Sequence, residues 1–300
     1  MKRKTLLGIF ALVVVFAVSA QQYDDERDFR VELVDGGRAV EIMMYVGGKQ
    51  NVNIPPRIGG LPVTSIGNHA FWNDEIISVT IPFGVTSIER NAFEICTKLT
   101  SVTIPSSVAS IGDFAFYRTK LASVNIPPGV TYIGDYAFAH CRSLTSVSIP
   151  SSVTSIGDGA FTYCESLVSV AIPANIVSIG YYVFASCTSL TSVNIPGSVT
   201  SIGLGAFSFC KSLTSVNIPS GVTAIGMGAF LDCTSLASIS IPRGVTTIGR
   251  GAFAEWRAGQ SINIDGRANQ AAADAVWGAS WREDCGARIN YRGSDISTGR

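Results

Sequence analysis

The chain has 300 residues, 22 basic and 22 acidic side chains, and a formal net charge of zero. Proteins that bind nucleic acid usually carry an excess of Lys and Arg on one face, and this balance argues against that class. Apolar residues make up 47% of the chain, which is ample for a continuous folded core. The length would allow two globular domains, but we interpret the chain as one continuous domain.

Residues 1–20 have the pattern of a secretory signal peptide: a basic start at residues 2–4, an apolar stretch at 6–18 and small residues at 18–20. The apolar stretch is too short to span a bilayer comfortably, although an uncleaved anchor is an alternative. Cleavage would remove three basic residues and leave 19 basic minus 22 acidic side chains, a net charge of −3. We therefore expect an exported protein with no membrane insertion after signal cleavage.

Residues 21–62 are predicted to form an N-terminal cap. Phe29–Val34 and Val40–Val46 alternate between apolar and polar residues on either side of an Asp-Gly-Gly turn, which is typical of a hairpin. Asn51–Pro55 then resembles a first, imperfect copy of the repeat that follows.

A repeat with a period of 22 or 23 residues fills residues 63–264. One marker is the dipeptide Ile-Pro, whose isoleucines are Ile81, Ile104, Ile126, Ile149, Ile172, Ile195, Ile218 and Ile241. The second is a phenylalanine at positions 71, 93, 116, 138, 161, 184, 207, 230 and 253. A fixed period of this length indicates a solenoid, in which each coil buries its apolar edge on its neighbours.

The coil at residues 144–166 shows how one repeat is expected to fold. Leu144, Val147 and Ile149 alternate as a short strand with one buried face, and Pro150 ends that strand because it lacks a backbone N–H. Phe161 belongs to the returning segment and points inward. Nine such coils, with strands about 4.8 Å apart, would span on the order of 40 Å.

The repeat L-x-S-V-x-I-P-x-x-V-T-S-I-G-x-x-A-F-x-x-C closely resembles the BspA-like, or treponemal-class, leucine-rich repeat over residues 50–264. The resemblance implies a leucine-rich-repeat solenoid that is mainly β, with stacked parallel short strands, turns and short helical segments, in about nine coils of 22–23 residues. It also implies an exported bacterial protein, and several relatives are implicated in adhesion to host or microbial proteins.

Residues 265–300 are expected to form a C-terminal cap and tail, since the end of a solenoid must cover its exposed core. Asn269–Trp281 is predicted to be a helix, Ala287–Tyr291 a last short strand, and Ser294–Arg300 a frayed tail.

Six of the seven cysteines recur three residues after a repeat phenylalanine, namely Cys96, Cys141, Cys164, Cys187, Cys210 and Cys233. The column is interrupted near Asp74 and Thr119, where a coil is one residue shorter and the cysteine is interpreted as deleted. Stacked coils give these side chains parallel directions, which does not suit a disulfide, so we interpret them as small buried apolar groups. Disulfides between coils and a metal site are the alternatives. Cys285 has no assigned partner.

No catalytic or cofactor motif is found in the sequence, and we predict neither an enzyme nor a cofactor or metal. His69 and His140 are expected in surface turns. Asp113, Asp135 and Asp158 share one repeat position, so they should stack. They are interpreted as caps of short helical turns, with a cation site as the alternative.

Two surfaces are candidates for protein binding. The strand face carries small hydroxyl and amide groups, represented by Ser123, Asn125, Ser146, Ser192, Asn194 and Asn217. The loop edge carries aromatic residues, of which Phe114, Tyr136, Tyr181 and Tyr182 are the first choice, since aromatic side chains often dominate binding energy. These aromatics have a structural alternative, which is to cover the core edge at Gly159 and Gly205.

The sequence therefore predicts an exported, non-enzymatic solenoid that binds proteins, as a cell-surface adhesin for host extracellular or other microbial proteins. A structural or scaffolding protein of the periplasm or envelope is the alternative. The sequence does not identify the partner.

Overall fold

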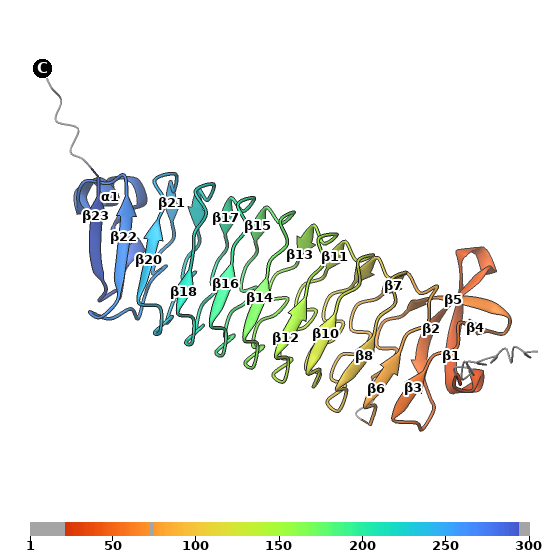
Figure 1. The fold of residues 1–300 in the computed structure, drawn as a ribbon. Helices are drawn as coiled ribbons and strands as arrows, with labels where there is room; N and C mark the ends of the chain where they lie inside the picture. Colours follow the sequence, from red (N-terminus) through yellow and green to blue (C-terminus); the bar gives the residue numbers. More distant parts are fainter. Residues whose placement is uncertain (1–21, 73–74, 294–300) are drawn as a thin grey trace, which may run out of the picture.

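The computed structural model describes residues 22–72 and 75–293, and it forms a β-solenoid of about 11 turns (Figure 1). The predicted signal peptide and C-terminal tail lie outside the described residues. The predicted class, a leucine-rich-repeat solenoid of stacked parallel strands, is confirmed. The coils carry short strands joined by turns, and the described helices lie in the terminal regions.

One face of the solenoid bears the strands of the L-x-S-V-x-I segments, which pair in parallel with equivalent residues opposite each other, as in Ser123↔Ser146 and Val124↔Val147. The central strands form an unbroken parallel ladder from β10 to β18. The strands of this face are β3 (Asn51–Asn53), β6 (Ser78–Thr80), β8 (Ser101–Thr103), β10 (Ser123–Asn125), β12 (Ser146–Ser148), β14 (Ser169–Ala171), β16 (Ser192–Asn194), β18 (Ser215–Val216), β20 (Ser238–Ile241), β22 (Ser261–Asp265) and β23 (Arg288–Arg292).

A second face is built from shorter strands. They are β5 (Leu61–Ile66), β7 (Ser87–Ile88), β9 (Ser110–Ile111), β11 (Tyr132–Ile133), β13 (Ser155–Ile156), β15 (Ser178–Ile179), β17 (Ser201–Ile202), β19 (Ala224–Ile225) and β21 (Thr247–Ile248). The ladder runs from β5 to β13 and again from β15 to β21, with a break between β13 and β15.

Many of the Ser and Thr residues of the repeat hold successive coils together. Their hydroxyls donate to a carbonyl of the preceding coil, as in Thr214 to Thr191 at 3.0 Å and Ser198 to Ile176 at 2.7 Å. Each such bond satisfies a backbone acceptor at the coil edge, so these hydroxyls are part of the folding pattern.

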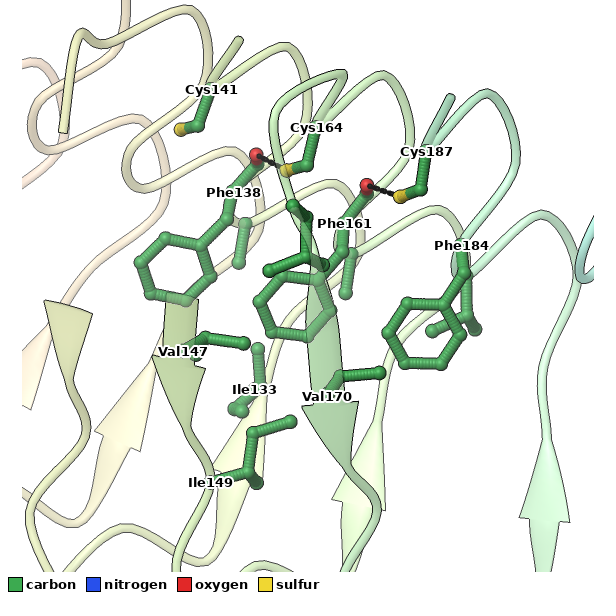
Figure 2. Close-up of a cluster of buried hydrophobic side chains, with 14 of the residues drawn as sticks. Ile133, Phe138, Cys141, Val147, Ile149, Phe161, Cys164, Val170, Phe184 and Cys187 are labelled. Carbon is green, nitrogen blue, oxygen red and sulfur yellow. Dashed lines mark hydrogen bonds between the residues drawn. The ribbon is translucent and has the colours of Figure 1, made fainter. Parts of the chain in front are cut away.

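The core is a column of phenylalanine rings from Phe71 to Phe253, one in each coil. Figure 2 shows three of them, Phe138, Phe161 and Phe184. Adjacent rings stack with centroids 4.8 Å apart at Phe71–Phe93, widening to 5.9 Å at Phe230–Phe253. Tyr45 continues the stack at the N-terminal end, and Trp281 closes it edge-on at the other. The ring of each coil is thus covered on both sides by its neighbours.

The cysteine column lies beside the rings, and the prediction that it is buried is confirmed. Cys164 Sγ donates to the carbonyl of Phe138 at 3.2 Å, and Cys187 Sγ to that of Phe161 at 3.3 Å (Figure 2). All seven cysteines are free thiols. Burial raises the pKa of Cys141 and of Cys210 to about 12, and the pKa of Cys164 also lies well above its usual range. The column is therefore chemically inert packing.

The interpretation that the column skips Thr119 was wrong. Thr119 is buried at the cysteine position, with Oγ1 3.2 Å from Cys141 Sγ. The missing residue must lie after Thr119, in the outer loop. Trp256 occupies the same position in the last coil, where its indole N–H donates to the Phe230 carbonyl at 2.8 Å.

The N-terminal region covers the first coil. The antiparallel pair β1 (Phe29–Val34) and β2 (Ala39–Tyr45) forms the predicted hairpin, and β4 (Arg57–Ile58) pairs antiparallel with β5. Short 3-10 turns occupy Glu26–Asp28 and Asp35–Gly37.

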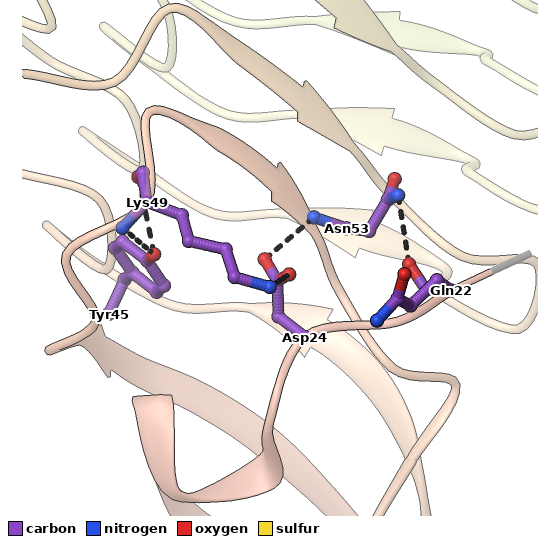
Figure 3. A network of polar contacts seen from close by, with 5 residues as sticks. All are labelled: Gln22, Asp24, Tyr45, Lys49 and Asn53. Atoms are coloured by element: carbon purple, nitrogen blue, oxygen red, sulfur yellow. Dashed lines mark hydrogen bonds and ion pairs between the residues drawn. The ribbon is translucent and has the colours of Figure 1, made fainter.

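A polar network ties this region to the first strand of the solenoid face (Figure 3). Asp24 is buried and accepts from Lys49 Nζ at 2.7 Å and from the Asn53 N–H at 2.9 Å. The hydroxyl of Tyr45 accepts from the Lys49 N–H at 3.0 Å, and burial raises the pKa of Tyr45. The buried carboxylate is therefore paired, as buried charges must be.

The C-terminal region closes the other end. Helix α1 (Gln270–Trp277) has Asn269 as its N-cap, with Oδ1 accepting from the Ala272 N–H, and it ends before Gly278, whose φ is +73°. The predicted helix continued to Trp281, but the chain breaks at this glycine and forms a 3-10 turn at Ala279–Arg282. Strand β23 adds the last parallel strand, beside β22, one residue later than predicted.

Candidate protein-binding surfaces

The predicted binding residues lie on three different surfaces. Ser123 and Asn125 flank the buried Val124 on β10 and are exposed, which makes them part of a polar strand face. The other four strand-face candidates are exposed in the same way, namely Ser146, Ser192, Asn194 and Asn217. The strand face is thus a regular strip of small polar groups, and it lies apart from the aromatic candidates.

The four aromatic candidates line two different depressions, although Tyr181 and Tyr182 are adjacent in the sequence. Phe114, Tyr136 and Tyr182 line one groove, whereas Tyr181 lines a different depression with Leu204 and Met227. Phe114, Tyr136 and Tyr182, which share one repeat position, therefore lie together, and Tyr181 lies in a separate depression.

We call the groove lined by Phe114, Tyr136 and Tyr182 the aromatic groove. Its volume is about 360 Å³, and it crosses several coils along their turns. Its aromatic lining comprises Phe114, Tyr117, Tyr136, His140, Tyr163, Tyr182 and Phe209. Within it, Phe114 stacks on Tyr136 with ring centroids 5.1 Å apart, and His140 stacks on Tyr163 at 4.4 Å.

The backbone beneath the groove has a left-handed conformation that does not favour aromatic residues. One position in each coil has a φ near +55° and holds Phe114, Tyr136 or Tyr182 in three coils, but glycine in others, such as Gly228. A second such position holds Tyr163 and Phe209. A residue with a side chain costs roughly 1–2 kcal/mol in this conformation. Local backbone preference therefore does not explain the aromatics.

Part of the explanation is packing. A Cβ placed on Gly159 would come within 2.4 Å of the Tyr136 ring, and one placed on Gly205 within 2.5 Å of the Tyr182 ring. Each tyrosine therefore lies over a glycine of the next coil, as the structural alternative predicted. The cover is incomplete, because Tyr182 is 39% exposed and Phe209 40% exposed.

A second depression, which we call the basic notch, adjoins the groove at His140. It has a volume of about 420 Å³ and is lined by Thr97, Arg118, Thr119, Lys120, His140, Arg142 and Ser143. Burial lowers the pKa of His140, and the nearby Arg118 and Arg142 lower it further. His140 is consequently neutral at pH 7, and the charge of the notch comes from Arg118, Lys120 and Arg142.

The basic notch was not predicted from the sequence. The signal was present in the coil that is one residue short: four residues separate Phe116 from Leu121, where five separate Phe138 from Leu144. Thr97 and Ser143, from the coils on either side, line the space beside this shortened loop. The notch is thus a consequence of the one-residue deletion in this coil.

The stacked aspartates have a role that differs from the predicted one. Asp113 Oδ1 accepts from the Asp135 N–H at 2.9 Å, Asp135 Oδ1 from the Asp158 N–H at 2.8 Å, and Asp158 Oδ1 from the Tyr181 N–H at 2.7 Å. Each carboxylate therefore bonds the backbone of the next coil instead of capping a helical turn of its own. Among residues 22–72 and 75–293, no group of three His, Cys, Asp or Glu side chains is placed to hold a metal ion.

His69 lies in a turn at the N-terminal end of the solenoid. Its Nδ1 is 3.5 Å from a carboxylate oxygen of Glu94, and its ring lies beside Trp72, which is 72% exposed. His69 and His140 therefore both lie in turns, as predicted.

The chain belongs to the BspA-type leucine-rich repeat family. The family model matches residues 64–188 and 154–277 and finds six copies of the repeat. Solenoids of repeated units present extended surfaces to their partners, and this fold class generally binds proteins.

Two solved structures share the fold. A leucine-rich repeat protein from Bacteroides ovatus is 27% identical, with a TM-score of 0.64 over 92% of this chain and 79% of that one. A leucine-rich repeat protein of T. pallidum is 29% identical, with a TM-score of 0.54 over 72% of this chain and 91% of that one. No curated protein matches the chain.

None of the helices in the part of the chain that the structure describes is long and apolar enough to cross a membrane.

Proposed function

We propose that this chain is an exported bacterial repeat protein that binds a partner protein through the aromatic groove, acting as a cell-surface adhesin. The observation that carries the proposal is the row of half-exposed aromatic rings at backbone positions that disfavour them. A solvent-exposed residue held against its backbone preference is a reason to look for function.

Packing energetics favour the groove over the strand face as the main contact. Aromatic side chains give a large buried area on binding and lose few rotamers, whereas single Ser and Asn contacts contribute little. The rings in the groove are further fixed by stacking on one another, as Phe114 is on Tyr136. A prearranged surface loses less entropy when it binds. The polar strand face would then contribute hydrogen bonds at the edge of the contact.

The primary experiment measures binding of residues 21–300 to a panel of extracellular-matrix and plasma proteins by label-free kinetics. We expect saturable binding to one or two members, and the change Tyr182→Ala should weaken it at least about tenfold. Tyr181→Ala is the matched control, because Tyr181 lies outside the groove and should leave the affinity within about twofold.

Two results would count against this proposal. One is equal loss of binding with Tyr181→Ala and Tyr182→Ala, which would move the contact away from the groove. The other is the absence of saturable binding to any panel member, which would favour a scaffolding role in the envelope.

Location is tested separately on intact cells. A surface adhesin should be cleaved by added protease without disruption of the outer layers, and a soluble periplasmic marker should stay intact in the same sample. Protection of both proteins would favour the periplasmic or envelope role.

A further inference from the structure

The basic notch and the aromatic groove are continuous. His140 lines both depressions, and the neighbouring residues Tyr117 and Arg118 line the groove and the notch respectively. The Arg118 guanidinium lies over the Tyr117 ring, 5.3 Å from its centroid. A ligand that covers the rings at this end of the groove therefore meets the cations of the notch directly.

The notch concentrates positive charge on a solenoid that has little. Residues 76–253 contain eight basic side chains, and three of them, Arg118, Lys120 and Arg142, line this one depression. The acidic group at its edge is Glu165, 3.3 Å from Arg142. Three cations and one carboxylate leave a local charge of 3 − 1 = +2, with His140 neutral.

Arg118 and Lys120 form no ion pair with any residue in the described part of the chain. Several other exposed cations of the repeats are paired, namely Lys98 with Glu75, Lys211 with Asp232 and Arg250 with Glu283. Unpaired cations that share one depression attract an anion more strongly than a single exposed cation does, because the charges act together in a partly enclosed space.

We propose that the notch receives an oxyanion carried by the partner protein beside an aromatic or apolar side chain, so that the joined site recognises an acidic peptide segment. The oxyanion is a carboxylate or the sulfate or phosphate ester of a tyrosine, and the adjacent side chain covers Tyr117 and Tyr163. This inference rests on the proposed protein-binding role of the groove.

The class of ligand follows from the fact that the basic notch adjoins the aromatic groove. A free anion would use the notch without the rings, and an apolar segment would use the rings without the cations. The notch holds about 420 Å³, which is ample for an ester or carboxylate group with part of its side chain. Only a ligand with both features uses the whole surface.

The test uses fluorescently labelled ten-residue peptides of one sequence that differ at a central residue, which is O-sulfotyrosine, phosphotyrosine, glutamate or unmodified tyrosine. We expect saturable binding of at least one oxyanion peptide to residues 21–300, and binding of the tyrosine peptide at least about tenfold weaker. The order among the three oxyanions identifies which source the notch prefers.

Two protein variants locate the contact. Lys120→Gln should weaken the preferred peptide about tenfold, whereas Lys211→Gln, which removes a cation of the same solenoid outside the notch, should change its affinity less than about twofold. Thermal unfolding by circular dichroism confirms that both variants fold.

Several outcomes overturn the inference. These are the absence of saturable binding of any oxyanion peptide, an unchanged affinity with Lys120→Gln, or stronger binding of a sulfated oligosaccharide that Tyr163→Ala does not affect. Failure of the groove itself is distinguishable. If Tyr182→Ala abolishes binding of the panel protein and Lys120→Gln leaves its affinity unchanged, the protein-binding proposal stands and the oxyanion inference fails.

Discussion

The solenoid carries two aromatic columns with the same period, and they behave in opposite ways. The inner column has phenylalanine in every coil from Phe71 to Phe253, and each ring is fully buried. The outer column changes from coil to coil. In chain order it holds His69, Asn91, Phe114, Tyr136, Gly159 and Tyr182, and then glycine in the last three coils. Stacking demands the same ring in every coil, whereas the outer positions carry no such demand. Variation within a repeat is therefore where binding is best sought, and constancy reports folding.

The largest expected effect concerns the thiols beside the inner column. Five of them have a raised pKa in the folded protein. In the unfolded chain they ionise near about 8.5. Unfolding thus releases protons above that pH, so the free energy of unfolding should fall as pH rises through about 9, by up to about 1.4 kcal/mol per thiol per pH unit.

Urea unfolding under reducing conditions at pH 7.5, 8.5 and 9.5, a range set by the thiol pKa near about 8.5, measures this dependence. A variant with Cys164→Ala and Cys187→Ala should lose about two fifths of the slope above pH 8.5, since each buried thiol contributes similarly. A flat profile, or a slope unaffected by the two changes, would contradict the burial-driven shift.

The second prediction compares two phenylalanines of one coil. Phe207 is fully buried between rings, and Phe209, two residues later, is 40% exposed. Phe207→Ala should lower the free energy of unfolding by about 3–5 kcal/mol through loss of contact and an unfilled cavity. Phe209→Ala should change it by less than about 1 kcal/mol. Chemical denaturation measures both, and similar losses would mean that the aromatic residues of the groove also hold the fold.

The aspartate ladder offers a smaller, more local test. Asp135→Ala removes the acceptor of the Asp158 N–H and should cost about 1–2 kcal/mol. Asp135→Asn keeps an oxygen acceptor at the same place and should cost clearly less in thermal or urea unfolding. Equal losses in the two variants would assign the effect to charge instead of the hydrogen bond.

The smallest effect is the energetic coupling between Tyr182 and Gly205, the glycine of the next coil that lies under its ring. Gly205→Ala places a Cβ against the Tyr182 ring and in a left-handed conformation with φ +57°. In a double-mutant cycle with Tyr182→Ala, we expect a coupling of about 0.5–1 kcal/mol, because the clash disappears with the ring and only the backbone cost stays. Additive losses would show that the ring moves away freely.

The fold could be predicted from the sequence because each coil repeats the same local physics. The Ile-Pro and Phe spacing predicted parallel stacking, and the position of each cysteine after its phenylalanine predicted a buried column. Short-range errors came from single residues: Gly278 ends the last helix earlier than its composition suggested, and Thr119 occupies a position interpreted as deleted.

The sites could be predicted only in part. Tyr181 and Tyr182 are adjacent in the sequence, yet the left-handed backbone at Tyr182 sends the two rings to different depressions. The aspartates stack as predicted, but their bonds run to the next coil, which a single repeat does not reveal. Cations of the shortened coil and its neighbour meet in the basic notch only because the coils are stacked.

The sequence by itself determined the period, the inward-facing residues and the parallel ladder, because these depend on patterns that every coil repeats and that burial enforces. The tertiary structure decided which exposed residues share a surface. That depends on the backbone conformation of individual turns and on one missing residue in one loop, and neither affects the pattern of burial.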